Sequence, residues 1–206
     1  MRFLLILIVM AAALWSGYWF VASSGVKSGF EHWFEARRAD GWAADYGELS
    51  VGGFPNRIDT SFTALELADP ETGLAWEAPF FQVLALSYRP NHVIAIWPHD
   101  QRIATPYEKF ALGSADMRAS LVLEPDTDLT LARTTLTAEE LVIAPVGGRE
   151  TTGITALTLA AERVPADDAP SYRLGLSADG FAPSLPWRVS VDPAGSLPDT
   201  LDALQA

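Results

Sequence analysis

The side chains that could carry catalysis or bind a metal are few and scattered along the chain. There is no cysteine, and the three histidines, His32, His92 and His99, do not share a spacing typical of metal ligands. His99 precedes Asp100, and a histidine beside a carboxylate can act as a general base with its orienting group. No nucleophile or second carboxylate stands at motif spacing from this pair. We therefore predict that the protein is not an enzyme and uses no metal or cofactor.

Two pairs of neighbouring acids, Glu139 with Glu140 and Asp167 with Asp168, also fail to define a site. Neighbouring side chains of an extended chain point to opposite faces, so we interpret both pairs as solvated charges in turns. Residues 147–149 (Gly-Gly-Arg) are interpreted as a hairpin turn, and the chain has no phosphate-binding loop and no Gly-x-Ser-x-Gly motif. The formal net charge of −12 repels phosphate backbones, which argues against nucleic acid as a partner.

The element that must position the rest of the chain is its apolar N-terminus. Residues 3–22 are 20 positions without a charge, and a helix of that length spans about 30 Å, the thickness of the hydrocarbon core of a bilayer. We predict a transmembrane anchor over residues 1–23. Amphipathic aromatic side chains gather at its far end, where they are expected at the membrane interface: Trp15, Tyr18, Trp19 and Phe20.

A cleaved signal peptide is the competing interpretation of this segment, with Arg2 as its basic start. The apolar run is longer than the core of about 7–15 residues that signal peptides have, which favours a retained anchor. Arg2 favours a cytoplasmic N-terminus, but Lys27, Arg37 and Arg38 follow the other end and nearly balance it. Because the N-terminus is too short to be a translocated domain, we predict that the bulk of the chain crosses the membrane.

Residues 24–40 predict an amphipathic helix that follows a break at residues 23–25 (Ser-Ser-Gly). Apolar positions recur there at spacings of three and four, and Asp40 and Gly41 supply the stop. The recurring positions are Val26, Phe30, Trp33, Phe34 and Arg37.

Residues 41–206 predict a β-rich domain built as a twisted antiparallel meander, so the fold class is mainly β with few helices. Residues 58–63, 118–123, 157–159 and 172–177 alternate apolar and polar side chains, as half-buried strands do. Residues 81–88 and 93–97 are apolar on both faces, which is typical of strands in the middle of a sheet, and the turn signal at residues 89–91 pairs them as a hairpin. Residues 197–204 resemble the opening turns of a helix, and we expect a C-terminally truncated product.

Several stretches together resemble an uncharacterised bacterial envelope family, domain of unknown function 2125, over about the first hundred residues. The stretches are residues 18–20 (YWF), 37–42 (RRADGW), 51–57 (VGGFPNR) and 88–95 (YRPNHVIA). That family is similar to the AsmA-like group, and this likeness implies an inner-membrane helix followed by a long twisted sheet in the periplasm. In that group the sheet is thought to curl into a groove that suits lipid acyl chains.

The resemblance implies a membrane-anchored protein of envelope maintenance or lipid handling, with acyl chains and other envelope proteins as its expected partners. The aromatic and aliphatic residues of the first half are expected either to fill an ordinary core or to line such a groove. The alternative function is an assembly scaffold built as a closed β-sandwich. The residues expected to line the groove are Phe62, Trp76, Phe81, Leu84, Leu86, Ile94, Ile96 and Trp97.

Overall fold

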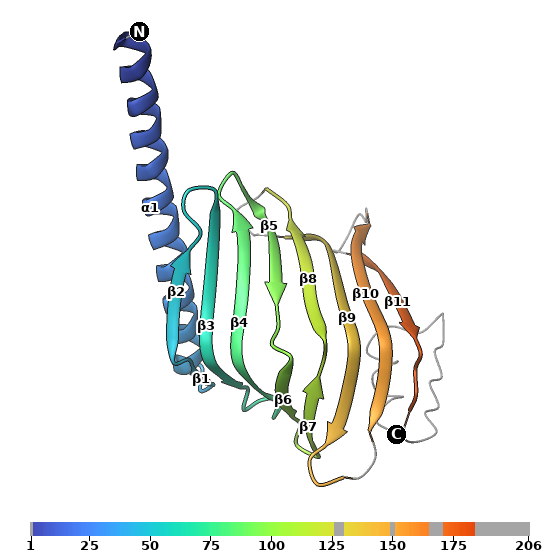
Figure 1. Cartoon of the computed structure of the whole chain (residues 1–206). Coiled ribbons are helices and arrows are strands. Elements are labelled where there is room, and N and C mark those ends of the chain that lie inside the picture. Colours follow the sequence, from blue (N-terminus) through green and yellow to red (C-terminus); the bar gives the residue numbers. More distant parts are fainter. Residues whose placement is uncertain (1, 126–129, 149–150, 165–170, 184–206) are drawn as a thin grey trace.

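The protein folds into one long N-terminal helix and a single antiparallel sheet (Figure 1). The computed structural model describes residues 2–125, 130–148, 151–164 and 171–183. The acids Asp167 and Asp168, Arg149 and the helix-like segment 197–204 lie outside the described residues.

Helix α1 (Arg2–Ala39) runs without interruption through residues 23–25. The predicted break is therefore wrong, and the anchor and the amphipathic segment form one helix. Ser23 is buried and its hydroxyl donates to the carbonyl of Phe20, a bond that satisfies the side chain within the helix. A single glycine costs a helix only about 1 kcal/mol, which packing against the sheet outweighs.

The predicted strands are confirmed, and most are longer than their alternating cores. The strands are β1 (Ala43–Asp45), β2 (Glu48–Gly52), β3 (Arg57–Ala68), β4 (Ala75–Leu86), β5 (Arg89–Ile96), β6 (Asp100–Ala104), β7 (Lys109–Gly113), β8 (Asp116–Leu123), β9 (Leu131–Pro145), β10 (Thr152–Val164) and β11 (Ser171–Asp179).

The sheet is a meander in which two of the strand positions are each occupied by two shorter strands in succession. β5 and β6 both pair with β4 and follow one another along one path, and β7 and β8 both pair with β9 along the next. All eleven strands belong to this one hydrogen-bonded sheet, so the two separate sheets of a β-sandwich are not formed by the described residues.

The predicted hairpin is confirmed as the pair of β4 and β5, but its turn lies earlier than the sequence signal. The turn consists of Ser87 and Tyr88, and Arg89 already opens β5. Ser87 is fully buried, and its hydroxyl donates to the carbonyl of Asn56 in the neighbouring turn at 3.0 Å. This bond between turns accounts for the shift.

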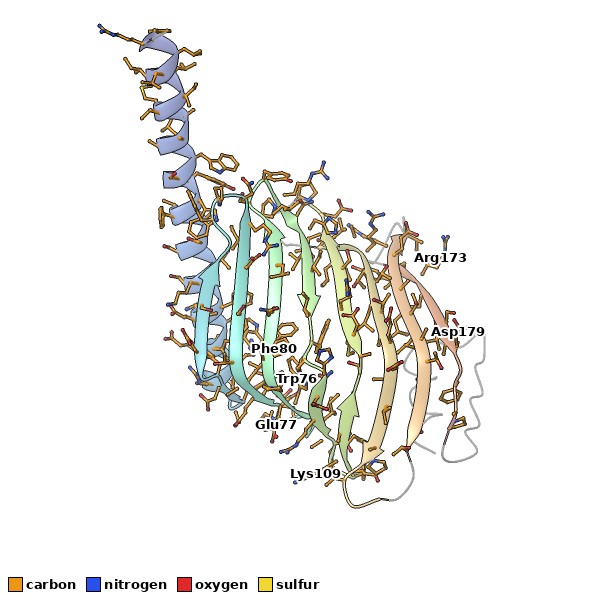
Figure 2. All side chains as sticks on the ribbon, viewed as in Figure 1. Trp76, Glu77, Phe80, Lys109, Arg173 and Asp179 are labelled. Atoms are coloured by element: carbon orange, nitrogen blue, oxygen red, sulfur yellow. The ribbon has the colours of Figure 1, made fainter. Side chains whose placement is uncertain are left out.

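The strand register divides the side chains of the sheet between two faces. Phe62 of β3 packs against α1. We call the face of the sheet that carries Phe62 and its cross-strand partners the helix face. The face on the other side of the sheet, which carries Glu66, Glu77 and Arg102 as directly opposed residues, is called the far face. Trp76 and Glu77, neighbours on β4 that belong to different faces, are labelled in Figure 2.

The core of the protein lies between α1 and the first strands. Rings of Phe30 and Phe34 from the helix meet the ring of Phe62, at centroid distances of 5.1 and 5.6 Å. Tyr46 adds a ring 4.7 Å from that of Phe34. The predicted apolar stripe of the helix is thus confirmed, and it extends upstream to Ser23 and Trp19, which are buried.

Two strands are distorted at the same level of the sheet. Ala64 of β3 and Glu140 of β9 have φ angles of 45° and 50°, values that side chains other than glycine rarely adopt. Glu139 and Glu140 are exposed but lie inside β9, so the expectation that they occupy a turn is wrong. The distortion reverses the alternation of side chains at this point, as a β-bulge does.

Candidate functional site

The middle of α1 is joined to the sheet by three aromatic donors. The Trp15 indole donates to the carbonyl of Pro55 at 3.0 Å, and the Trp19 indole donates to the carbonyl of Arg57 at 2.6 Å. The Tyr18 hydroxyl donates to the carbonyl of Ser87 at 2.7 Å. The acceptors belong to the turn between β2 and β3 and to the turn between β4 and β5, so one face of the helix is joined to two neighbouring turns.

Ring packing strengthens the same junction. The ring of Phe54 lies 5.4 Å from that of Trp19, edge to face, and 6.1 Å from that of Phe20. Trp19 is 6% exposed, whereas Phe20 is 61% exposed. Of the four residues predicted at a membrane interface, Trp19 therefore faces the domain, and Trp15, Tyr18 and Phe20 remain accessible.

The junction brings together segments that the sequence had singled out separately. Residues 18–20 of the helix contact the turn at residues 53–57 and the turn at residues 87–88. We call the sheet edge formed by these two turns the upper edge, after its position in Figure 1. The N-terminal half of α1 extends beyond this edge (Figure 1).

The helix face stays apolar far beyond the strands that α1 covers. A row of cross-strand partners starts at Val83 and runs without a break through five further strands. Each of these five partners is Ala or Leu. The row is Val83, Ala95, Ala119, Leu136, Leu159 and Leu176. Leu159 and Leu176 are 41% and 72% exposed, although their row faces the same side as the helix.

The far face is polar at the same level. The row next to the Val83 row consists of Gln82, Ile96, Arg118, Thr137, Thr158 and Ser177. A sheet that is apolar on one side and polar on the other buries the apolar side against something in most proteins. In the described residues, α1 contacts β1 and β2 most extensively, at one end of this face.

A small apolar cavity marks the place where the helix meets the open part of the helix face. Its volume is about 180 Å³, and every lining residue is apolar. The lining residues are Phe30, Trp33, Phe34, Phe62, Leu65, Leu67, Trp76 and Phe81. An apolar cavity of about 150 Å³ is large enough to bind benzene, so this one could hold a few methylene groups.

The eight residues predicted to line one groove divide between the two faces. Phe62, Trp76, Phe81 and Trp97 lie on the helix face, where the Phe81 ring is 5.4 Å from Trp76 and 5.2 Å from Trp97. Leu84, Leu86, Ile94 and Ile96 lie on the far face by their register. The described residues therefore do not bring all eight onto one surface.

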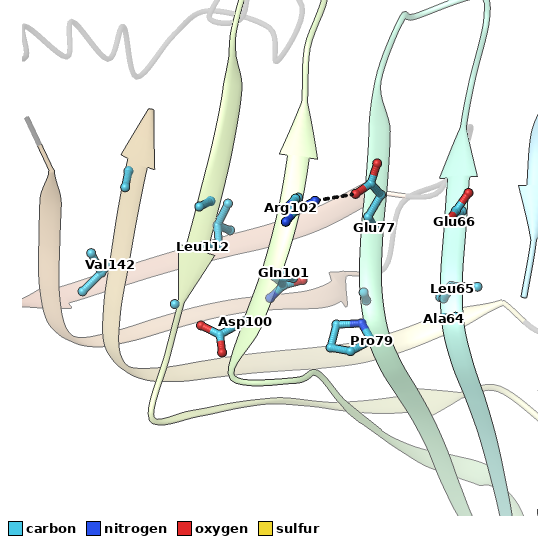
Figure 3. A pocket seen from close by; sticks show the side chains of 14 residues that line it. Ala64, Leu65, Glu66, Glu77, Pro79, Asp100, Gln101, Arg102, Leu112 and Val142 are labelled. Atoms are coloured by element: carbon cyan, nitrogen blue, oxygen red, sulfur yellow. Dashed lines mark hydrogen bonds and ion pairs between the residues drawn. The ribbon is translucent and has the colours of Figure 1, made fainter. Parts of the chain in front are cut away.

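A second hollow, with a volume of about 690 Å³, crosses the far face at the distorted level of the sheet (Figure 3). Its floor includes Ala64 and Pro79, and its rim carries Glu77 and Arg102, which form an exposed ion pair at 3.5 Å. Glu66 and Asp100 add two further acids to the lining of this hollow.

The histidines do not form a catalytic arrangement in the described part of the chain. His99 Nδ1 lies 2.9 Å from the carbonyl of Ser114, so this nitrogen carries the proton and bonds the backbone. His92 Nε2 lies 2.9 Å from the Ser120 hydroxyl, across β5 and β8. His32 is exposed on α1, and no group of three or more metal-ligating side chains occurs among the described residues.

One carboxyl is perturbed by its turn. The Thr72 hydroxyl and the backbone N–H of Glu71 donate to Asp69, and these bonds lower the pKa of that carboxyl. Asp69 is partly exposed in the connection between β3 and β4, and the two bonds hold the turn that it opens.

Comparison with known proteins yields one match. The sequence profile of a bacterial family described as "Uncharacterized protein conserved in bacteria (DUF2125)" matches residues 19–206. No curated protein and no solved structure is significantly similar to the chain. The profile begins at Trp19, the helix residue whose indole bonds the β2–β3 turn.

Proposed function

Because this chain belongs to the DUF2125 family, whose description names no activity, we propose a function from its geometry: a membrane-anchored protein that handles lipids without catalysis. In this proposal α1 crosses the bacterial inner membrane, the sheet stands in the periplasm, and the helix face takes up acyl chains. The helix is the one element in the described residues that is long and apolar enough to cross a membrane.

The observation that carries the proposal is the apolar row of the helix face, which runs from Val83 to Leu176 and is partly open. Burial of apolar area stabilises a contact by about 25 cal/mol per Å² without requiring a fixed geometry. Acyl chains are long, flexible and apolar, so a row of small and aliphatic side chains suits them. Large exposed apolar surfaces on proteins mark sites that contact other proteins, membranes or apolar ligands.

The position of the row relative to the anchor supports the same function. The stripe of α1 that packs on the sheet and the row lie on one face, and the stripe begins inside the apolar run of the helix. An acyl chain leaving the bilayer along α1 would therefore meet the helix face without crossing a polar surface.

The test is lipid co-purification of the full-length chain, extracted in mild detergent, by native mass spectrometry. We expect bound phospholipid with the natural sequence and a severalfold loss with Leu159→Gln combined with Leu176→Gln. The matched control is Thr158→Gln combined with Ser177→Gln, which adds the same groups one position away on the far face. Absence of lipid from the natural chain, or equal loss in both variants, would refute the function.

The membrane orientation needs a separate measurement. Since the chain has no cysteine, Tyr107→Cys creates a unique thiol at a residue that is 96% exposed. A membrane-impermeant maleimide should label this thiol in cells whose outer membrane has been permeabilised. Labelling only after the inner membrane is broken would place the sheet in the cytoplasm and refute the periplasmic assignment.

A further inference from the structure

We propose that the upper edge of the sheet is a second membrane contact, immersed in the headgroup layer, with Phe54 and Tyr88 reaching the acyl boundary. The partner is the same phospholipid bilayer that α1 crosses, and Arg57 and Arg89 at this edge face the lipid phosphates. This inference rests on the proposed membrane anchor and adds a contact that the anchor alone does not require.

The segment of α1 that the domain leaves free is too short to cross the hydrocarbon core of a bilayer. The domain begins to contact α1 at Trp15, so the uncontacted apolar segment is residues 3–14. Twelve residues of helix rise about 18 Å, whereas the hydrocarbon core of a bilayer is about 30 Å thick. The remaining eight uncharged positions, residues 15–22, rise about 12 Å, and they lie beside the turns of the upper edge.

Placing the apolar run of α1 across the bilayer therefore brings the upper edge of the sheet into the membrane. The polar headgroup layer on one side is only about 5–8 Å thick, from the difference between the whole bilayer and its hydrocarbon core. The free segment falls about 12 Å short of the hydrocarbon core, so the turns are drawn through the headgroup layer to the acyl boundary, and local thinning of the bilayer takes up the remaining mismatch. Tilting the helix shortens its reach along the membrane normal and increases the shortfall.

Five backbone carbonyls of the upper edge accept hydrogen bonds from within the protein. The carbonyls of Pro55, Arg57 and Ser87 accept hydrogen bonds from the helix aromatics. The carbonyl of Asn56 accepts from the Ser87 backbone N–H at 2.9 Å, and that of Gly53 accepts from the Arg57 N–H at 2.9 Å. Unpaired backbone groups cost several kcal/mol near hydrocarbon, so an edge with these carbonyls paired can enter it.

The side chains of the edge match the layers they would meet. Phe54 is 52% exposed and Tyr88 is 60% exposed, an arrangement typical of amphipathic aromatics at an interface. Arg57 and Arg89 are also exposed, and Arg57 pairs with Asp59. Basic residues at the headgroup level are attracted to anionic lipids, although the chain as a whole carries a net charge of −12.

Site-directed spin labelling of the full-length chain in vesicles of phosphatidylcholine and phosphatidylglycerol tests this contact. Three single-cysteine variants are compared: Leu7→Cys in the free helix, Tyr88→Cys at the upper edge, and Tyr107→Cys in the turn between β6 and β7. Power-saturation measurements with oxygen, which favours lipid, and a polar nickel complex, which favours water, report the depth of each label. Arg89→Cys repeats the edge measurement at the next residue.

We expect the ratio of oxygen to nickel accessibility at residue 88 to exceed that at residue 107 severalfold and to fall below that at residue 7. If residue 7 is in lipid while residues 88 and 89 are as aqueous as residue 107, the edge contact is refuted and the anchor stands. If residue 7 itself is aqueous, the anchor and the edge contact fall together. A Tyr88→Cys protein with altered near-ultraviolet circular dichroism is replaced by Arg89→Cys, whose result then decides.

Discussion

Replacing Trp19 by phenylalanine should weaken the junction between α1 and the sheet measurably. The substitution keeps an aromatic ring against Phe54 but removes the indole N–H that donates to the Arg57 carbonyl at 2.6 Å. Since Trp19 is 6% exposed, water cannot readily replace the lost donor. A buried acceptor left without its donor costs about 1–3 kcal/mol.

For a chain of this size, each kcal/mol lowers the melting temperature by about 2–4 °C, so the expected shift is about 2–12 °C. Thermal unfolding of the full chain in detergent, followed by near-ultraviolet circular dichroism, measures it. The matched control is Trp15→Phe, because Trp15 is 38% exposed and its acceptor, the Pro55 carbonyl, also lies 3.4 Å from the Ser87 hydroxyl. We expect a cost of about 1 kcal/mol or less for the control. Equal shifts in the two variants, or a larger one in the control, would refute the account of the junction.

Three further substitutions test other parts of the structure by the same thermal assay. Phe62→Ala removes a ring that is 2% exposed at the centre of the core and should cost about 3–5 kcal/mol; a cost below about 1 kcal/mol would contradict the placement of the core. Gly53→Ala should destabilise the protein more than Gly147→Ala. Both glycines have φ near +90°, but a Cβ at residue 53 would lie 2.9 Å from the Arg57 carbonyl oxygen, whereas a Cβ at residue 147 would meet no atom within 4 Å. The reverse order of stability would contradict the turn geometry. Arg102→Ala breaks an exposed ion pair with Glu77 and should cost less than about 1 kcal/mol, and a larger cost would show that the far-face hollow is more closely built than described.

The parts of the fold that depend on local pattern could be predicted from the sequence. The alternation of residues 58–63 predicts the centre of β3, and two apolar runs around a turn predict the pair of β4 and β5. The continuity of α1 could not be predicted, because local propensity favours a break at Gly25 and only the sheet packed against Ser23 and Val26 overrides it.

The junction escaped prediction for a different reason. Trp15, Tyr18 and Trp19 bond acceptors that lie 40, 69 and 38 residues away in the chain, and backbone carbonyls leave no signature in the sequence. The expected groove lining divided because it joined residues of both parities on β4, such as Phe81 and Leu84, and the two parities belong to opposite faces. Applying the two-residue period strictly separates Phe81 from Leu84, but it misplaces Trp76, which has the parity of Leu84 and packs on the helix face.

The unbroken course of α1 has a mechanical consequence. Because α1 has no break at residues 23–25 and makes three hydrogen bonds to the upper edge, the helix and the first strands form one rigid unit. In the proposed membrane placement, a tilt of the N-terminal half is passed to the sheet, whose strands run roughly along the helix (Figure 1). In that proposed placement a thicker bilayer draws the helix and the sheet inward and a thinner one lets them rise, so membrane thickness sets the height at which the apolar row meets its surroundings.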